Sequence, residues 1–585
     1  QLLDLGFDPF AKQGAIRQHH GGAATALGRF AARHNGTGHA KLAHDVLQEQ
    51  QRSFRRLHIG REVGLDADFF FTAKRWIGED DVHALAVADF VDPVIQRITI
   101  GDLWGFQPMQ QQVHLRQHVG QGFGFLAEQR AALHLALRAK PHEHYAFNGV
   151  NVLPMVQQVH TKMADFCRRL HAGQVHGATG QPIRDIVHIG VGGSGLGPRV
   201  VLEALAPLAV KSVRVHIVTG GDWVELEDVL HQVDPARTLF VLASKSLTTS
   251  EPLQNLQTGL QWLQTQLDLD QALIRQHHLL VLTAKPEAAQ QLGVADHAIF
   301  PLWDWVGGRF SLWSAIGLPI AMAIGVEQFE QLRHGAWMMD QHVQHTPAAH
   351  NMPVMMALAG LYNIHHRHTV ALSVVAYSYR LRSFASYLQQ LEMESNGKRV
   401  TQRGEPVAMP TATVVFGGVG SDAQHSYFQL LHQGTWKIAS DFIAIAHSEP
   451  HAKQHANKLL ANCFAQILAL DYGDQADVDA APSHNQQLVC QGQQPSSLIL
   501  LPALTPYYLG MLIALYEHKT YIQGRILGVN SFDQWGVVLG KKIAQDIEPL
   551  FDCPHTTKHT HPDVYPWLQE VWARRAEQPS PTTEP

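Results

Sequence analysis

The 585-residue sequence has few charged side chains, and their signs nearly cancel. Asp, Glu, Lys and Arg make up 16% of the chain, and 45 basic against 51 acidic residues give a formal net charge of −6. A general nucleic-acid-binding protein normally carries a basic excess, so this balance argues against that class. The hydrophobic content of 45% argues equally against an intrinsically disordered chain.

Cysteine is also scarce, with four residues and no CxxC pair. This number argues against a disulfide scaffold and fits a reducing compartment. The first residues lack a basic stretch followed by an apolar core, so we expect no secretory signal.

Long apolar runs are missing as well. The most apolar stretch, residues 497–516, contains Pro502 and Pro506 and begins with a strand-like Leu-Ile-Leu-Leu run. A membrane span needs about 20 apolar residues. The two prolines favour a buried strand followed by a helix, and we expect no membrane partner.

Strands and helices alternate from about residue 127. Apolar runs typical of buried strands lie at 185–190, 212–218, 238–243 and 279–283, then at 369–376, 412–416, 438–446 and 497–501. A helical stretch at 311–365 separates the two sets, and 130–138 is helical in composition. The alternation predicts the α/β class, with doubly wound parallel sheets covered by helices. We divide the chain into 1–126 (fold uncertain), a first α/β domain at 127–330, a second at 331–560, and a tail at 561–585.

A glycine-rich loop at 190–197 follows a predicted strand and precedes a helix. Its backbone N–H groups suit an anion, although a tight turn without a ligand is the structural alternative. Gly190, Gly192 and Gly195 also satisfy GxGxxG, so a nucleotide-dependent dehydrogenase must be considered. Only Asp222 loosely offers the acidic residue that such a site needs about 20 positions later.

A second loop, SKSLTT at 244–249, also joins a strand to a helix. Its hydroxyl groups and Lys245 suit one phosphate group, whereas their alternative role is to cap the helix. Ligands of parallel α/β sheets bind at the carboxyl ends of strands, so two such loops on neighbouring strands favour a ligand site.

Arg309 and Glu394 are the candidates for charge stabilisation and proton transfer. Arg309 follows two glycines among aromatic residues and could stabilise an oxyanion, or simply pair with Asp304. Glu394 precedes a Ser-Asn-Gly turn, which suits a general base at the edge of a helix. A solvated surface position is the alternative for Glu394.

Two further candidates are His425 and Lys541. His425 and His432 are seven residues apart, which predicts that they share a helix face, and histidine moves protons near neutral pH. Lys541 follows Gly540 and either lies close to the site or is an exposed helix lysine. No metal is expected at His555, His559 and His561, because no carboxylate or cysteine pattern accompanies them.

Taken together, these segments resemble the glucose-6-phosphate isomerase (phosphoglucose isomerase) family. In the family's order they are HIGVGGSGLGP at 188–198, ASKSLTT at 243–249, WDWVGGRFSLWSAIG at 303–317, QQLEMESNGK at 389–398, QHSYFQLLHQGT at 424–435, LYEHK at 515–519 and FDQWGVVLGKK at 532–542. The resemblance implies two sugar-isomerase (SIS-type) domains in a cytoplasmic homodimer. It implies interconversion of D-glucose 6-phosphate and D-fructose 6-phosphate, with no metal and no nucleotide cofactor.

The resemblance also implies residue roles. Glu394 matches the family's base, Arg309 the arginine facing the reacting carbons and Lys541 the active-site lysine. His425 matches the ring-opening residue, which the partner subunit supplies. Substrate-binding roles fall on Gly193, Ser194, Ser244, Lys245, Ser246, Thr249 and Gln390.

The residue types agree with aldose–ketose chemistry. His425 and Lys541 suit the proton transfers of ring opening, Glu394 suits proton transfer from C2 to C1 through a cis-enediol, and Arg309 suits the enediolate charge. The alternative is a non-catalytic regulator that binds sugar phosphates. It should lack Glu394, His425 or Lys541, and the sequence contains all three.

Some positions depart from the family's usual residues. Ser246 replaces a threonine, Gly195 an aspartate, Leu391-Glu392 a Gly-Asp type pair and Val538 a glutamate. Residues 1–126 lack the family's N-terminal pattern. Our hypothesis is that they are strongly diverged or come from a disturbed reading frame.

Overall fold

The computed structural model describes residues 70–74, 131–476, 485–552 and 563–577. Two five-stranded sheets with helices on both faces form its framework, which confirms the predicted α/β class. All eight predicted strands are present. The predicted helix at 130–138 is wrong, because only a 3₁₀ turn, η1 (His134–Leu137), forms there.

The first sheet is entirely parallel, in the order β5-β4-β6-β7-β8. Its strands are β4 (Asp185–Ile189), β5 (Arg214–Val218), β6 (Thr238–Ala243), β7 (Leu279–Thr283) and β8 (Ile299–Pro301). Every residue of β4, β6 and β7 is buried. A parallel sheet is covered on both faces, so its central strands are apolar throughout rather than alternating.

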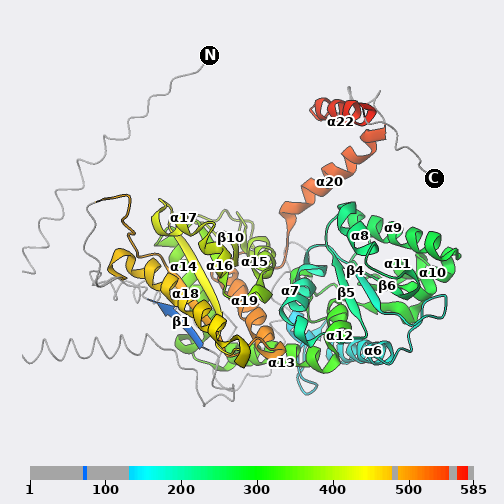
Figure 1. Cartoon of the computed structure of the whole chain (residues 1–585), viewed down its shortest axis with the longest axis horizontal. Coiled ribbons are helices and arrows are strands. Elements are labelled where there is room, and N and C mark those ends of the chain that lie inside the picture. The colour runs from blue at the N-terminus through cyan, green and yellow to red at the C-terminus, as the bar shows by residue number, and fades with distance from the viewer. Residues whose placement is uncertain (1–69, 75–130, 477–484, 553–562, 578–585) are drawn as a thin grey trace, which may run out of the picture. The chain divides into compact units, whose positions relative to one another are not determined.

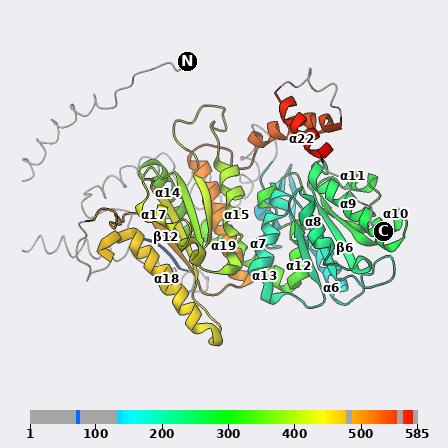
Figure 2. The same cartoon turned by 45° about the horizontal axis from the view of Figure 1, so that its top comes forward.

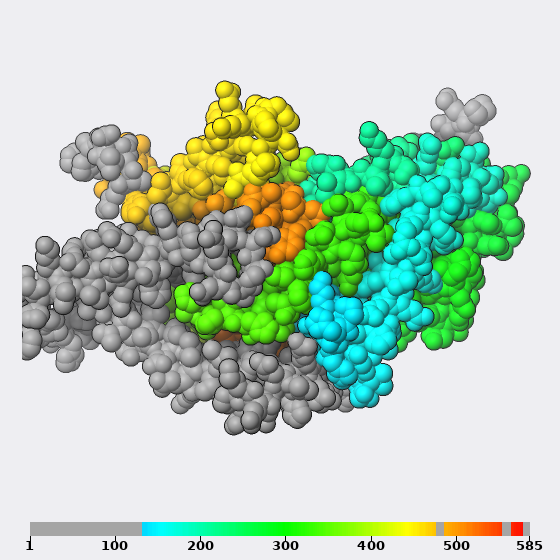
Figure 3. Space-filling model, turned by 90° about the horizontal axis from the view of Figure 1, so that it is seen from below, coloured from blue at the N-terminus to red at the C-terminus, as the bar shows by residue number. Residues whose placement is uncertain are grey.

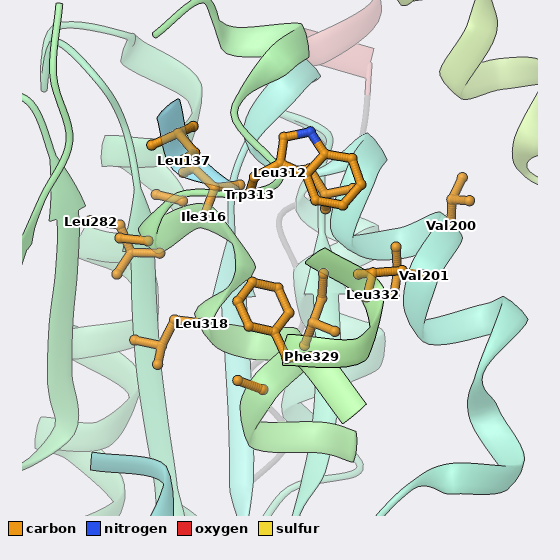
Figure 4. Close-up of a cluster of buried hydrophobic side chains, with 14 of the residues drawn as sticks. Leu137, Val200, Val201, Leu282, Leu312, Trp313, Ile316, Leu318, Phe329 and Leu332 are labelled. Atoms are coloured by element: carbon orange, nitrogen blue, oxygen red, sulfur yellow. The ribbon is translucent and has the colours of Figure 1, made fainter. Parts of the chain in front are cut away.

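Helices cover this sheet on two sides (Figures 1 and 2). One layer contains α6 (Leu153–His171), α7 (Leu196–Ala204) and α12 (Leu318–Ile324). The other contains α8 (Trp223–Leu230), α9 (Ser250–Leu267), α10 (Gln271–His278) and α11 (Pro286–Gln291). Figure 4 shows part of the core beside the first layer, where Trp313 and Phe329 lie among leucine, isoleucine and valine side chains.

The second sheet has the order β1-β12-β11-β9-β10. Four strands are parallel: β9 (Ala371–Ala376), β10 (Val414–Val419), β11 (Ile438–Ile445) and β12 (Ser496–Leu501). The fifth, β1 (Phe70–Lys74), pairs antiparallel with β12. No fold was predicted for residues 1–126, yet β1 within them forms the edge of this sheet.

Short and long helices flank the second sheet. One side has α16 (Gly420–Gln424), α17 (Phe428–Gln433) and α18 (Lys453–Tyr472), packed on a core that includes Val375, Phe428 and Phe442. The other side has α15 (Phe384–Leu388), which continues into a π-helical turn, η10 (Gln389–Glu394). Further along, α20 (Val538–Ile547) and α22 (Tyr565–Glu577) end the described chain.

Helix α19 (Pro506–Ile526) follows β12 directly. The Thr505 hydroxyl accepts a hydrogen bond from the backbone N–H of Tyr508, and Pro506 occupies the first turn, where its missing N–H costs little. Helix α19 packs against α13 (Val326–His345) and α14 (Met352–His365), and Figure 3 shows its orange atoms between yellow and green ones. The predicted buried strand followed by a helix at 497–516 is therefore confirmed. Within the described residues, no helix is long and apolar enough to cross a membrane.

Candidate active site

Arg309 joins segments that are far apart in the sequence. It lies in the 3₁₀ turn η6 (Gly308–Phe310) with 4% of its surface exposed. Its Nε donates to Ser395 Oγ at 2.6 Å, and Nη1 donates to Glu394 Oε2 at 3.2 Å. Nη2 donates to the backbone carbonyls of Ser531 at 2.6 Å and Asp533 at 3.0 Å. The carboxylate of Asp304 instead lies 3.6 Å from Lys285 Nζ, so the structure does not favour the alternative of an Arg309–Asp304 pair.

Glu394 is the last residue of η10, and 22% of its side chain is exposed. Its carboxylate is therefore fixed by a buried guanidinium on one side and accessible on another. π-Helical turns occur often at functional sites. An accessible carboxylate with a fixed cation beside it can take a proton from carbon while the cation stabilises the resulting anion.

Lys398 caps the segment that contains Glu394. Its Nζ donates to the carbonyl oxygens of Glu394 at 2.6 Å, Ser395 at 3.0 Å and Asp533 at 2.9 Å. Burial lowers the pKa of Lys398, and the neighbouring Asp533 carboxylate opposes that shift. Lys398 and Arg309 thus both attach the end of η10 to residues 531–533.

The glycine-rich loop contacts the turn that contains Arg309. A β-carbon on Gly193 would overlap the backbone of Gly308, so the two loops touch main chain to main chain. Gly192 has φ +56° and lies against the Gln390 amide. Gln390 Oε1 is buried, and it has no hydrogen-bond partner in the described part of the chain. Buried acceptors in proteins are normally hydrogen-bonded, so this atom suits a water molecule or a ligand.

His188 contacts the glycine-rich loop through its ring. Its Nε2 lies 2.8 Å from the carbonyl oxygen of Ser194, and burial lowers its pKa to about 4. The ring is therefore neutral near pH 7, with its proton on Nε2. A β-carbon at Gly195 would overlap the Gly190 carbonyl, so this loop has no room for the aspartate usual in the family.

The SKSLTT loop begins at the end of β6, beside the glycine-rich loop that follows β4. Ser246 Oγ lies 2.7 Å from Thr248 Oγ1, and Ser244 Oγ accepts from the Leu247 N–H at 3.2 Å. Thr249 precedes α9, but its side chain makes no capping hydrogen bond.

Lys245 connects this loop to the segment before Arg309. Its Nζ donates to the carbonyl oxygens of Asp304 at 2.9 Å and Val306 at 2.8 Å. The ammonium is therefore near the loop hydroxyls but committed partly to main-chain carbonyls. The structure thus brings together Gly193, Gln390, Arg309 and Glu394, with the SKSLTT loop on the adjacent strand.

Two predicted residues are not part of this cluster. His425 is exposed just after α16, and Lys541 is exposed on α20. Among the described residues, no hydrogen bond or ion pair connects either side chain to Glu394 or Arg309. The expectation that His425 and His432 share a helix face is wrong, because α16 and α17 are separate. Between them, Tyr427 packs on Phe416 and accepts from the Ser373 hydroxyl, and these sheet contacts interrupt the helix.

Other candidates have simpler outcomes. The Asp222 carboxylate accepts from the Val224 N–H and caps α8. The three histidines at 555, 559 and 561 lie outside the described residues. Within those residues, no group of three or more His, Cys, Asp or Glu side chains is placed to hold a metal ion.

Sequence reasoning missed several supporting residues: His188, Ser395, Lys398, Asp533 and Gln534. Gln534 Oε1 accepts from Arg309 Nη1 at 3.2 Å. All five lie inside the motifs that carry the family resemblance, and this was the only signal available for them.

Comparisons with known proteins identify the family of this chain. The family model described as phosphoglucose isomerase matches residues 113–562 and so begins inside the N-terminal region. The glucose-6-phosphate isomerase of Acinetobacter venetianus is 45% identical over 448 residues, covering 73% of this chain and 78% of the relative. That of Cupriavidus metallidurans is 45% identical, covering 74% and 80%. The crystal structure of the Chlamydia trachomatis glucose-6-phosphate isomerase has a TM-score of 0.70 at 26% identity, covering 91% of this chain and 98% of that one. The chain belongs to the phosphoglucose isomerase family.

Proposed function

We propose that this chain, an aldose–ketose isomerase, interconverts D-glucose 6-phosphate and D-fructose 6-phosphate with Glu394 as its base and Arg309 as the stabilising cation. The observation that carries this proposal is the 3.2 Å contact between a buried guanidinium and a partly exposed carboxylate. Glu394 removes the C2 proton of the open-chain aldose and returns it to C1 of the cis-enediol. Arg309 stabilises the enediolate, because its charge is already in place before reaction.

The substrate phosphate binds remote from the reacting carbons. Ser244, Ser246 and Thr249 supply hydroxyl groups, Lys245 supplies positive charge, and Gly193 and Ser194 supply backbone of the neighbouring loop. Gln390 lies beside this loop, and its unpartnered amide oxygen suits a substrate hydroxyl or a bound water. Binding energy from the phosphate orients C1 and C2 at Glu394.

Ring opening requires proton transfer between the ring oxygen and O1, which we assign to His425 and Lys541. Both side chains are exposed in the single chain. We therefore propose a homodimer in which His425 acts in the partner's site. In this dimer α20 is covered, and Lys541 approaches the substrate. We place the enzyme in the cytoplasm, on the glycolytic and gluconeogenic route.

Neither rival function gains support. A non-catalytic regulator needs only the phosphate loops, yet Arg309, Ser395 and Lys398 are organised around Glu394 rather than around those loops. A dehydrogenase would need space above the glycine-rich loop for a nucleotide, whereas Gly193 is in contact with Gly308 there.

The test is conversion of fructose 6-phosphate to glucose 6-phosphate by the purified full chain, in parallel with Glu394→Gln. We expect the wild-type chain to be active and the variant to lose at least about 100-fold in kcat, as for removal of a general base. Glu449→Gln, at an exposed glutamate, serves as the matched control and should keep wild-type activity. Binding of sugar phosphate without turnover by the wild-type chain would favour the regulator.

A further inference from the structure

A buried ion pair lies two residues before Glu394. Lys519 Nζ on α19 is 2.8 Å from Oε1 and 2.9 Å from Oε2 of Glu392. Only 3% of Lys519 and 7% of Glu392 are exposed. The ammonium therefore binds both carboxylate oxygens inside the protein.

A second bond from the same helix lies two residues after Glu394. Asn396 Nδ2 donates to the backbone carbonyl of Thr520 at 2.8 Å, and Asn396 Oδ1 accepts from Ser531 Oγ at 2.7 Å. Lys519 and Thr520 are adjacent on α19. Consecutive residues of this helix thus bind the active-site segment on both sides of Glu394.

The charge on Lys519 is needed at this position. Burial raises the pKa of Glu392, the Lys519 ammonium opposes that shift, and the nearby Asp441 carboxylate adds to it. Asp441 is itself buried and accepts from the Tyr516 hydroxyl at 3.0 Å. Without the ammonium, the buried Glu392 carboxylate would face the charge of Asp441 without compensation, which is strongly unfavourable. Glu392 would then protonate or move, and η10 would move with it.

A cavity of about 40 Å³ touches the pair, and both polar and apolar residues line it. Its lining includes Asn363 and Thr369, whose Oδ1 and Oγ1 atoms are buried without a hydrogen-bond partner in the described part of the chain. This space can admit the larger guanidinium of an arginine at position 519.

We infer that Lys519, acting through Glu392, is a positioning residue for the Glu394 carboxylate. The inference rests on the proposed role of Glu394 as the base. Lys519 does not touch the reacting atoms. It helps to hold the segment 392–396 against α19 through two contacts, Glu392 with Lys519 and Asn396 with the Thr520 carbonyl. These contacts keep Glu394 facing both the substrate and Arg309.

The experiment compares Lys519→Met, the double variant Glu392→Gln/Lys519→Met, and Lys519→Arg. For each we measure kcat and KM for fructose 6-phosphate and the thermal unfolding midpoint. Lys458→Met, at an exposed lysine on α18, is the matched control. Wild type and Glu394→Gln in the same assay test the proposed function separately, because an inactive wild-type chain contradicts that function whatever the Lys519 variants do.

Since a displacement of about 1 Å can cost 100-fold, we expect Lys519→Met to lose about 10-fold to 100-fold in kcat, with KM within about twofold of wild type. Lys519→Met leaves the charge of the Glu392 carboxylate uncompensated, and the double variant removes that charge. The double variant should therefore recover at least about a third of the decrease in log kcat. The kcat of Lys519→Arg should stay within about threefold of wild type, since the cavity has room for the guanidinium group.

Several results would overturn the inference: wild-type kcat in Lys519→Met, a double variant no better than the single one, or a loss confined to KM. A lower unfolding midpoint with unchanged kcat would also do so, because it would show a role in stability alone. If Lys519→Met does not fold, Glu392→Gln alone replaces it. Removing the carboxylate charge that binds Lys519 Nζ should reduce kcat without changing KM, and wild-type kcat in Glu392→Gln would contradict the inference.

Discussion

Arg309 uses all three of its side-chain nitrogens to connect two segments of the candidate site. Nε and Nη1 bind side chains of the segment with Glu394, and Nη2 binds two backbone carbonyls of the 531–533 segment. A lysine has one nitrogen on a flexible stem and cannot reproduce this fork. The positive charge would remain while its direction would be lost.

We therefore predict that Arg309→Lys loses about 100-fold to 1,000-fold in kcat, the loss typical for removal of a preorganised anion-stabilising group. Steady-state kinetics with fructose 6-phosphate measures this directly. Arg574→Lys changes an exposed arginine on α22 and is the control. An Arg309→Lys enzyme with wild-type kcat would mean that charge alone suffices at this position.

Gly193 is the second residue with a sharp requirement. A β-carbon there would meet the Gly308 backbone, whereas a β-carbon on Gly418 in β10 meets no atom within 4 Å. We predict that Gly193→Ala lowers the free energy of unfolding by about 1–3 kcal/mol, the usual cost of overpacking, and also lowers activity. Gly418→Ala should change neither, as urea unfolding and turnover would show. Equal effects of the two substitutions would contradict the close contact of the two loops.

At the scale of an element, β4 ends in a loop that depends on a neutral histidine. Burial lowers the pKa of His188 to about 4, against an ordinary value near 6.5. The unfolded chain therefore binds more protons at this residue between pH 6.5 and 4. The linked stability is present above pH 6.5 and is lost as the pH falls through that window.

We predict that His188 alone removes about 2 kcal/mol of stability between pH 7 and pH 5. His188→Gln keeps an N–H donor near the position of Nε2 for the Ser194 carbonyl but does not titrate there. The wild-type free energy of unfolding should thus fall more steeply with acid than that of the variant, in urea titrations at both pH values. Using the difference between the two proteins cancels the contributions of other buried groups. Parallel pH dependences would contradict the assignment.

Element-scale features were largely predictable from sequence where burial is complete. Four of the eight predicted strands, β4, β6, β7 and β9, are buried throughout and are largely apolar, as expected for parallel strands covered on both faces. The three-residue strand β8 and the edge strand β1 were missed, since neither has a long enough run. Helices α16 and α17 were predicted as one because helical spacing does not register the sheet contacts of Tyr427.

The site was predictable only in part. Family motifs predicted Arg309 and Glu394 as site residues. The two residues are 85 positions apart, and no local pattern predicts their contact. The attachment of Glu394 through Glu392 and Lys519 connects residues 127 positions apart and has no sequence signal beyond two separate motifs. Long-range contacts of this kind come from the packing of α19 rather than from the local sequence.

At the scale of the whole molecule, the proposed action of His425 in the partner's site requires two subunits for one complete site. His425→Ala retains Glu394, and Glu394→Gln retains His425. In a closed dimer that shares His425 across the interface, a mixed dimer has one site with both wild-type groups. Two inactive homodimers should therefore produce activity when their chains are mixed.

We predict that refolding the two variants together in equal amounts restores about a quarter of wild-type activity, because about half the dimers are mixed and each has one complete site. Each variant refolded alone is the control and should stay inactive. If His425 served its own subunit, both sites of every mixed dimer would lack one group. A mixture with no activity, at a verified dimer mass, would contradict the shared site.

The most direct test of the central claim follows the proton that Glu394 moves. The purified full chain is incubated with fructose 6-phosphate in D₂O, and conversion and deuterium at C2 of the product are measured together. We predict conversion to glucose 6-phosphate with solvent deuterium at C2, since a single carboxylate can exchange its proton before returning it. Both signals should fall by at least about 100-fold in Glu394→Gln. Wild-type conversion and labelling in Glu394→Gln would contradict the account.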